Sequence, residues 1–173
     1  MIAIGASAGG TVAIQEILLQ LPADMPPMVV TQHIPAGFSL AFANPLNKLC
    51  SMEVCEAVNG DALHPGLALV APGDFHLLVR RAGSDVMFAS VAQTVGAHSV
   101  GILLTGMGTD GAKGMLALKR AGAPTIAQDQ ASCVVYGMPR EAKRLDAVGI
   151  VASLHDIGGV LTRTLKPQER KSA

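Results

Sequence analysis

The sequence lacks the clustered basic residues that are typical of proteins that bind nucleic acids or anionic membrane surfaces. Its 173 residues carry 13 basic and 13 acidic side chains, so the formal net charge is zero. The one basic run is the C-terminal "KPQERK", which we interpret as part of a solvated, charged tail over residues 166–173. Binding to DNA, RNA or anionic lipid depends on clustered Lys and Arg, so none of these partners is expected.

Tryptophan is absent, aromatic residues make up 3% of the chain, and there are only three cysteines, Cys50, Cys55 and Cys133. No Cys-x-x-Cys pair occurs and no two histidines have i, i+4 spacing. The sequence therefore predicts no metal, no cofactor and no disulfide framework. No apolar stretch reaches the roughly 18 residues of a membrane helix, and a glycine turn already at Gly5 leaves no room for a signal peptide. We expect a monomeric, cytoplasmic protein with one domain over residues 1–165.

Short β-branched runs alternate with amphipathic stretches along the whole chain. Strands are predicted over 2–4, 28–33, 52–57, 67–71, 100–106, 124–129 and 149–152, with further apolar runs at 76–80 and 133–137. Helices are predicted over 11–21, 39–49, 86–95, 111–120, 139–145 and 154–165, the first two starting at Thr11 and Ser39 as N-caps. This alternation predicts an α/β fold: a doubly wound, mostly parallel sheet with helices on both faces, in a Rossmann-like three-layer arrangement. Functional groups are then expected at the carboxyl ends of the strands.

The first strand is followed by "GASAGG", Gly5 to Gly10, a glycine-rich turn that holds one serine. Such a turn can cradle a phosphate on backbone N–H groups at a helix N-terminus. It can also mount Ser7 as a nucleophile above the sheet, with the same N–H groups forming an oxyanion hole. A tight strand–helix turn without chemistry is the third interpretation, and this stretch alone does not separate the three.

The second predicted strand ends in Gln32, His33, Ile34 and Pro35, with no acidic residue for a ribose. The chain also has no G-x-G-x-x-G and no lysine in the first turn, which disfavours a nucleotide site. A histidine is what a serine nucleophile requires, because a base must accept the hydroxyl proton. His33 is the candidate base, although a purely structural histidine is the alternative.

The central strand leads into "LLTGMGTDGAKGM", which places Asp110 at the start of a helix. An Asp there is often a helix cap, but glycines at 106, 108 and 111 are more than a cap requires and suggest a close backbone approach. Ser7, His33 and Asp110 would then meet at one sheet edge as nucleophile, base and orienting carboxylate. Their order along the chain differs from the Ser, Asp, His order of α/β-hydrolases.

Weaker candidates were found elsewhere along the chain. "APGDFH" places Asp74 and His76 at another predicted strand end and "HPG" adds His64, while His98 and His155 are expected at the surface. The segment "QDQASCVVYGMPREA" could line a substrate groove with Tyr136 and Arg140 exposed, or could simply be a helix entry with Pro139 near its first residue.

Three separated motifs resemble the catalytic domain of the chemotaxis protein-glutamate methylesterases, the CheB family. They are "IGASAGG" at 4–10, "TQHIP" at 31–35 and "LLTGMGTDGAKGM" at 103–115, supported by "LVAPGDFHL" at 69–77 and "IAQDQASCVVYGMPREA" at 126–142. The resemblance implies that Ser7 is the nucleophile, His33 the base and Asp110 its orienter, with the backbone amides at Ala8 and Met107 binding the oxyanion. It implies a chemoreceptor glutamyl methyl ester as substrate, methanol as product, and in many members also deamidation of receptor glutamines.

The sequence departs from the family pattern in three places. Ala8 stands where some members have threonine, and the stretch between Arg81 and Val86 is short. The phosphorylatable receiver domain of related full-length proteins is not expected, since only Met1 precedes "IAIGAS". The alternatives to a receptor methylesterase are a serine esterase or amidase with another substrate, and a binding module for a nucleotide phosphate.

Overall fold

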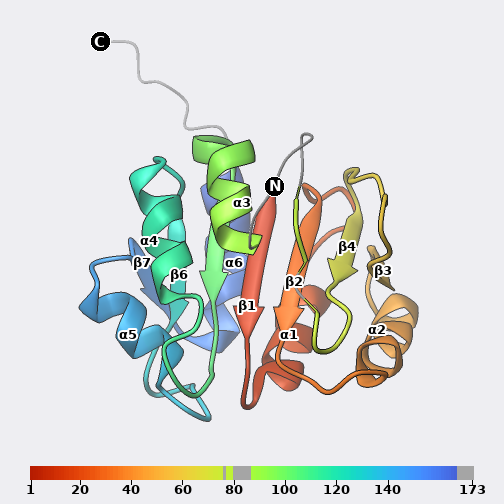
Figure 1. The fold of residues 1–173 in the computed structure, drawn as a ribbon, viewed down its shortest axis with the longest axis horizontal. Helices are drawn as coiled ribbons and strands as arrows, with labels where there is room; N and C mark the ends of the chain where they lie inside the picture. Colours follow the sequence, from red (N-terminus) through yellow and green to blue (C-terminus); the bar gives the residue numbers. More distant parts are fainter. Residues whose placement is uncertain (76, 80–86, 167–173) are drawn as a thin grey trace.

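The structure, a computed structural model, describes residues 1–75, 77–79 and 87–166. In this part of the chain seven strands form one sheet in the order β3-β4-β2-β1-β5-β6-β7, and every pairing is parallel. Figure 1 shows the arrows pointing the same way. The strands are β1 (Ile2–Ala6), β2 (Met28–Gln32), β3 (Glu53–Glu56), β4 (Leu67–Val70), β5 (Val100–Leu103), β6 (Thr125–Gln128) and β7 (Ile150–Ala152).

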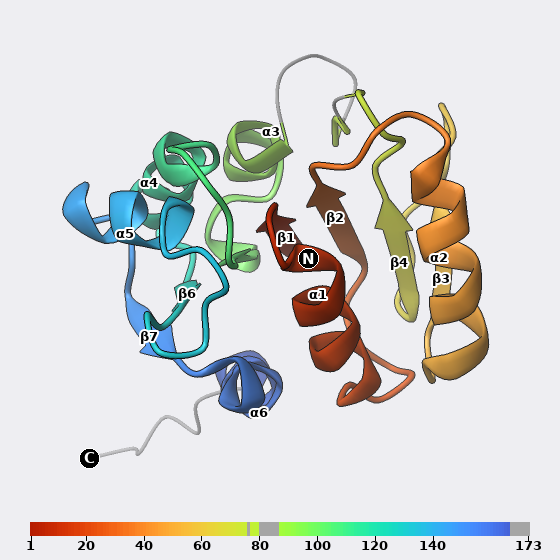
Figure 2. The same cartoon turned by 90° about the horizontal axis from the view of Figure 1, so that it is seen from below.

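The helices divide between the two faces of the sheet, as Figure 2 shows from below. One apolar core joins the sheet to α1 (Gly10–Leu19), α2 (Phe38–Leu49) and α6 (Leu154–Leu165). The other joins it to α3 (Met87–Thr94), α4 (Ala112–Arg120) and α5 (Met138–Arg144), and a short 3-10 helix at Gly96–His98 follows α3. The predicted three-layer α/β fold is confirmed, and the sheet is parallel throughout rather than mostly so.

The central strand β1 is buried along its whole length because both of its faces carry helices. The chain builds β2, β3 and β4 on one side of β1 and then returns to build β5 on the other side. The strand order therefore reverses at β1 and β5, and the carboxyl ends around such a switch point are where α/β sheets hold their sites.

Two predicted helix starts were wrong, for one physical reason. The residues that cap α1 and α2 are Gly9 and Gly37, both with left-handed backbone (φ 79° and 83°), and neither Thr11 nor Ser39 is an N-cap. Both caps have positive φ, a conformation that glycine adopts without steric penalty and that disfavours Thr or Ser. Ser39 is instead buried inside α2, where its hydroxyl donates to Glu56 and accepts from the backbone N–H of Gly73.

Other sequence-based boundaries differ less. The run at 133–137 contributes only an isolated bridge between Tyr136 and Gly106. Gly122 ends α4 in left-handed conformation, as its position predicts. Residues 76 and 80 of the run at 76–80, the short stretch at 81–86 and nearly all of the tail at 166–173 lie outside the described residues.

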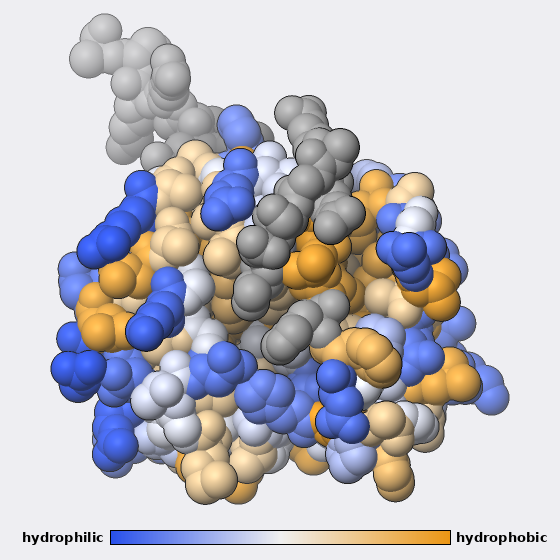
Figure 3. Space-filling model, in the orientation of Figure 1, coloured by the Kyte–Doolittle hydropathy of each residue, from blue (hydrophilic) through white to orange (hydrophobic). Residues whose placement is uncertain are grey.

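The exterior is mixed in character. Figure 3 shows hydrophilic residues interspersed with apolar ones over the face that carries α3 and α4. Among the helices of the described ranges, none combines the length and the apolar character that crossing a bilayer requires.

Candidate active site

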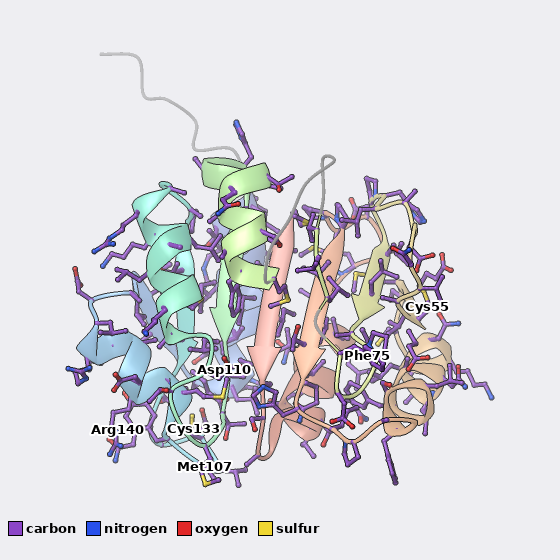
Figure 4. The ribbon with its side chains drawn as sticks, viewed as in Figure 1. Cys55, Phe75, Met107, Asp110, Cys133 and Arg140 are labelled. Carbon is purple, nitrogen blue, oxygen red and sulfur yellow. The ribbon has the colours of Figure 1, made fainter. Side chains whose placement is uncertain are left out.

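Three neighbouring strands deliver the predicted triad to the carboxyl edge of the sheet. Ser7 follows β1, His33 follows β2, and Asp110 lies in the turn between β5 and α4. Since β1 lies between β2 and β5, the serine is central. Figure 4 shows Asp110 at this edge, with Met107 in the same turn and farther from the sheet.

The three side chains form a continuous chain of polar contacts. His33 Nδ1 lies 3.2 Å from Ser7 Oγ, and His33 Nε2 lies 3.0 Å from Asp110 Oδ2. With the ring proton on Nε2, that N–H donates to the carboxylate and Nδ1 accepts the serine hydroxyl proton. These are the contacts that a nucleophile, a base and an orienting carboxylate make in a triad.

The ring nitrogens of His33 have exchanged the places they hold in the chymotrypsin-type triad, where Nε2 faces the serine. Nδ1, the nitrogen nearer the backbone, contacts Ser7, which follows the adjacent strand β1. Nε2 contacts Asp110 in the turn after β5. Either nitrogen can act as a base, so the chemistry is retained.

Thr105, a buried residue that follows β5, holds the turn that carries Ser7 through hydrogen bonds. The backbone N–H of Ser7 donates to the Thr105 carbonyl at 3.0 Å. The Thr105 hydroxyl donates to the Ala8 carbonyl at 2.8 Å and accepts from the N–H of Val135 at 2.9 Å. One residue thus joins the nucleophile turn to the loop at 130–137. Sequence reasoning missed it because no motif marks such a role.

The glycine-dense turn after β5 passes directly against Ser7. A Cβ on Gly106 would lie 2.2 Å from Met138 Sδ and 2.8 Å from Ser7 Cβ, so no side chain fits there. The close approach that the glycines suggested is therefore an approach to Ser7. Asp110 does not cap α4, because the N-cap is Gly111 with φ 76° and receives no side-chain hydrogen bond.

Two backbone donors near Ser7 remain available to an incoming anion. Within the described residues, the N–H groups of Ala8 and Met107 donate no hydrogen bond, and both residues are exposed. Ala8 follows Ser7, and Met107 follows Gly106, which lies against Ser7. Free N–H groups held by rigid turns are what an oxyanion hole requires.

A cleft of about 880 Å³ opens beside His33 and Asp110. Its walls include Phe75, Phe88 and Met138, so a substrate side chain entering it would meet apolar surface on the way to the polar triad. The weaker candidate Asp74 also borders this cleft. Its carboxylate accepts from the N–H of Ala36 at 3.1 Å and so ties the loop after β4 to the loop that carries the base.

The remaining histidines do not join the site. His64 contacts the carbonyl of its neighbour Pro65, His98 and His155 are exposed, and His76 lies outside the described residues. Across the described ranges, no three His, Cys, Asp or Glu side chains gather as metal ligands would. Arg140 is exposed at the sheet edge, as Figure 4 shows, and Tyr136 is half-buried.

The thiol of Cys133, which lies near Thr105, is expected to react slowly with electrophiles. Burial raises its pKa to about 11, the charge of Asp129 adds to the rise, and a hydrogen bond with Thr105 opposes it. The thiolate is the reactive form, so at pH 8 only about one molecule in 10³ carries it. Iodoacetamide should alkylate Cys133 of the native protein about 100-fold more slowly than an unperturbed cysteine. Peptide mapping at successive times after adding iodoacetamide measures the alkylation rate of Cys133. Equal alkylation rates in the native and the unfolded protein would contradict the prediction.

Comparisons with known proteins identify the family of the chain. The family model described as CheB methylesterase matches residues 2–161. A protein-glutamate methylesterase/protein-glutamine glutaminase of Methylobacillus flagellatus is 48% identical over 92% of this chain, and one of Syntrophotalea carbinolica is 49% identical over 89%. The crystal structure of the Thermotoga maritima CheB methylesterase catalytic domain superposes with a TM-score of 0.89 at 32% identity, covering 94% of this chain and 96% of that one.

The chain spans about half the length of the curated relatives it matches, 50% and 49% for the two proteins named above. It matches nearly all of the solved catalytic domain. The motifs, the parallel sheet and the family model therefore agree over the same residues, and the chain belongs to the CheB methylesterase family.

Proposed function

We propose that this chain hydrolyses glutamyl methyl esters on the cytoplasmic helices of chemoreceptors and releases methanol, as part of chemotactic adaptation. The observation that carries the proposal is the continuous contact from Ser7 through His33 to Asp110, at 3.2 and 3.0 Å, beside the free N–H groups of Ala8 and Met107. The names of the relatives support the substrate class.

The proposed mechanism uses the same groups in both half-reactions. His33 Nδ1 takes the Ser7 proton while Oγ attacks the ester carbonyl, and the Ala8 and Met107 N–H groups bind the oxygen anion. His33 then returns the proton to the departing methoxide, which leaves as methanol. Water, activated by the same nitrogen, cleaves the glutamyl-serine ester and restores the hydroxyl. Asp110 orients the ring and stabilises its positive charge.

The same acyl-enzyme chemistry extends to receptor glutamines, where ammonia replaces methanol as the leaving group. We assign catalysis to residues 1–165 and no catalytic part to the tail at 166–173. The chain would act as a monomer in the cytoplasm, where the receptor helices lie, and a receiver domain of the kind found in full-length relatives would control access to the site.

Methanol release from membranes that carry methylated chemoreceptors tests the proposal. The wild-type chain should release methanol and Ser7→Ala should release none above membranes alone. Release of ammonia from receptors with glutamine at the same positions tests the deamidase activity in parallel. Hydrolysis of small esters without any release from receptors would favour a general serine esterase, and no hydrolysis of either would contradict the proposed function.

A further inference from the structure

A buried amide joins the backbones of the nucleophile and the base. Gln32 is the last residue of β2, and only 6% of it is exposed. Its Nε2 donates to the carbonyl of Ser7 at 2.9 Å and to the carbonyl of His33 at 3.2 Å. A single NH₂ group therefore bridges the two residues whose side chains must meet.

The contact with Ser7 also sets the direction of a proposed oxyanion donor. The Ser7 carbonyl accepts a second hydrogen bond from the N–H of Gly10 at 2.7 Å, so its oxygen is held from two sides. The carbonyl of Ser7 and the N–H of Ala8 belong to one planar trans peptide and point in opposite directions. Whatever fixes the oxygen therefore aims the Ala8 N–H.

The contact with His33 completes the frame. The His33 carbonyl accepts from Gln32, and its N–H donates to the Ala6 carbonyl at 3.2 Å, which continues the pairing of β1 with β2. The backbone of the base is thus held at both of its polar groups. The Ser7–His33 distance is then set by backbone contacts and not by the 3.2 Å side-chain contact alone.

The oxygen of the same carboxamide, Gln32 Oε1, is buried and makes no hydrogen bond within the described residues. It lies against α1 so closely that a Cβ on Gly10 would be 2.0 Å from it, which explains the second glycine of "AGG". A buried acceptor without a partner lowers stability. Retaining an amide here is better explained by its two donor contacts than by packing.

We propose that Gln32 is a positioning residue, whose carboxamide holds Ser7 and His33 in register and aims the Ala8 N–H at the oxyanion. The proposal rests on the proposed hydrolase function and adds a residue to it. Misplacement of reacting groups by about 1 Å can lower a rate by about 100-fold. Loss of the bridge should therefore lower kcat and leave substrate binding nearly unchanged.

The test is Gln32→Met, which keeps the length of the side chain and removes both donors. We expect kcat for ester hydrolysis to fall about 10- to 100-fold with KM within about twofold of the wild-type value. The rate at which a fluorophosphonate labels Ser7 should fall by a similar factor. Gln93→Met, on the exposed side of α3, is the matched control and should leave kcat, KM and labelling unchanged.

The outcomes separate a positioning role from a structural one. Gln32→Glu replaces the donors with an ionised acceptor facing two carbonyls, so it should lose at least as much activity as Gln32→Met. A lower unfolding temperature with unchanged kcat and labelling, measured well below that temperature, would overturn the proposal. If the wild-type chain hydrolyses no ester, the proposed function fails, and the labelling rate still decides the role of Gln32.

Discussion

Ser7→Ala is expected to lower kcat for ester hydrolysis by about 10³-fold or more, and His33→Ala by a similar factor. Without the hydroxyl there is no atom to form the acyl-enzyme. Without the His33 ring, Ser7 Oγ has no hydrogen-bond partner among the described residues that could accept its proton. Because the two residues act as one unit, the double variant should be no worse than either single variant. Steady-state rates on a methylated receptor substrate, with far-UV circular dichroism to verify folding, check this.

Ser51→Ala is the matched control for the serine, because Ser51 is exposed and lies at the loop between α2 and β3. It should retain wild-type kcat. His33→Ala offers an additional test, since the His33 side chain is 48% exposed and free imidazole can reach the space it leaves. Imidazole should restore part of the His33→Ala rate and none of the Ser7→Ala rate. A Ser7→Ala variant that folds and keeps near wild-type activity would exclude Ser7 as the nucleophile.

The triad could be predicted from the sequence because strand alternation and residue chemistry coincide in it. A parallel sheet brings its strand ends together, so Ser7, His33 and Asp110 had only to be placed at the ends of predicted strands. Their contacts at 3.2 and 3.0 Å are consistent with that placement. The strand order was not predicted, and it places the strand before Ser7 between the strands before His33 and Asp110.

What sequence reasoning missed depends on backbone direction. Thr11 and Ser39 have the chemistry of helix caps, yet both helices start at glycines whose positive φ disfavours Thr and Ser. Gln32 and Thr105 donate hydrogen bonds to backbone carbonyls of the distant turn that carries Ser7. Such contacts leave no pattern along the chain, because any buried polar side chain next to a turn can make them.

Asp110→Asn is expected to lower kcat by about 10²- to 10³-fold, less than the loss of Ser7. An asparagine that donates from Nδ2 to His33 Nε2 forces the ring proton onto Nδ1, which then cannot accept the proton of Ser7. One that turns its oxygen to Nε2 keeps the tautomer but carries no charge to stabilise the imidazolium. The effect should be smaller than for a buried triad carboxylate, because the Asp110 side chain is 68% exposed and water screens its charge.

Asp146→Asn is the matched control for Asp110→Asn. Asp146 pairs with Lys119 at 2.9 Å outside the site, is 93% exposed, and has φ 54°, which asparagine tolerates well. Both variants lose one surface carboxylate, so they change the net charge equally. The ratio of their kcat values therefore isolates the contact with His33, and only Asp110→Asn should also shift the imidazole proton resonance. Equal activity of the two variants would show that the 3.0 Å contact between His33 and Asp110 contributes nothing to catalysis.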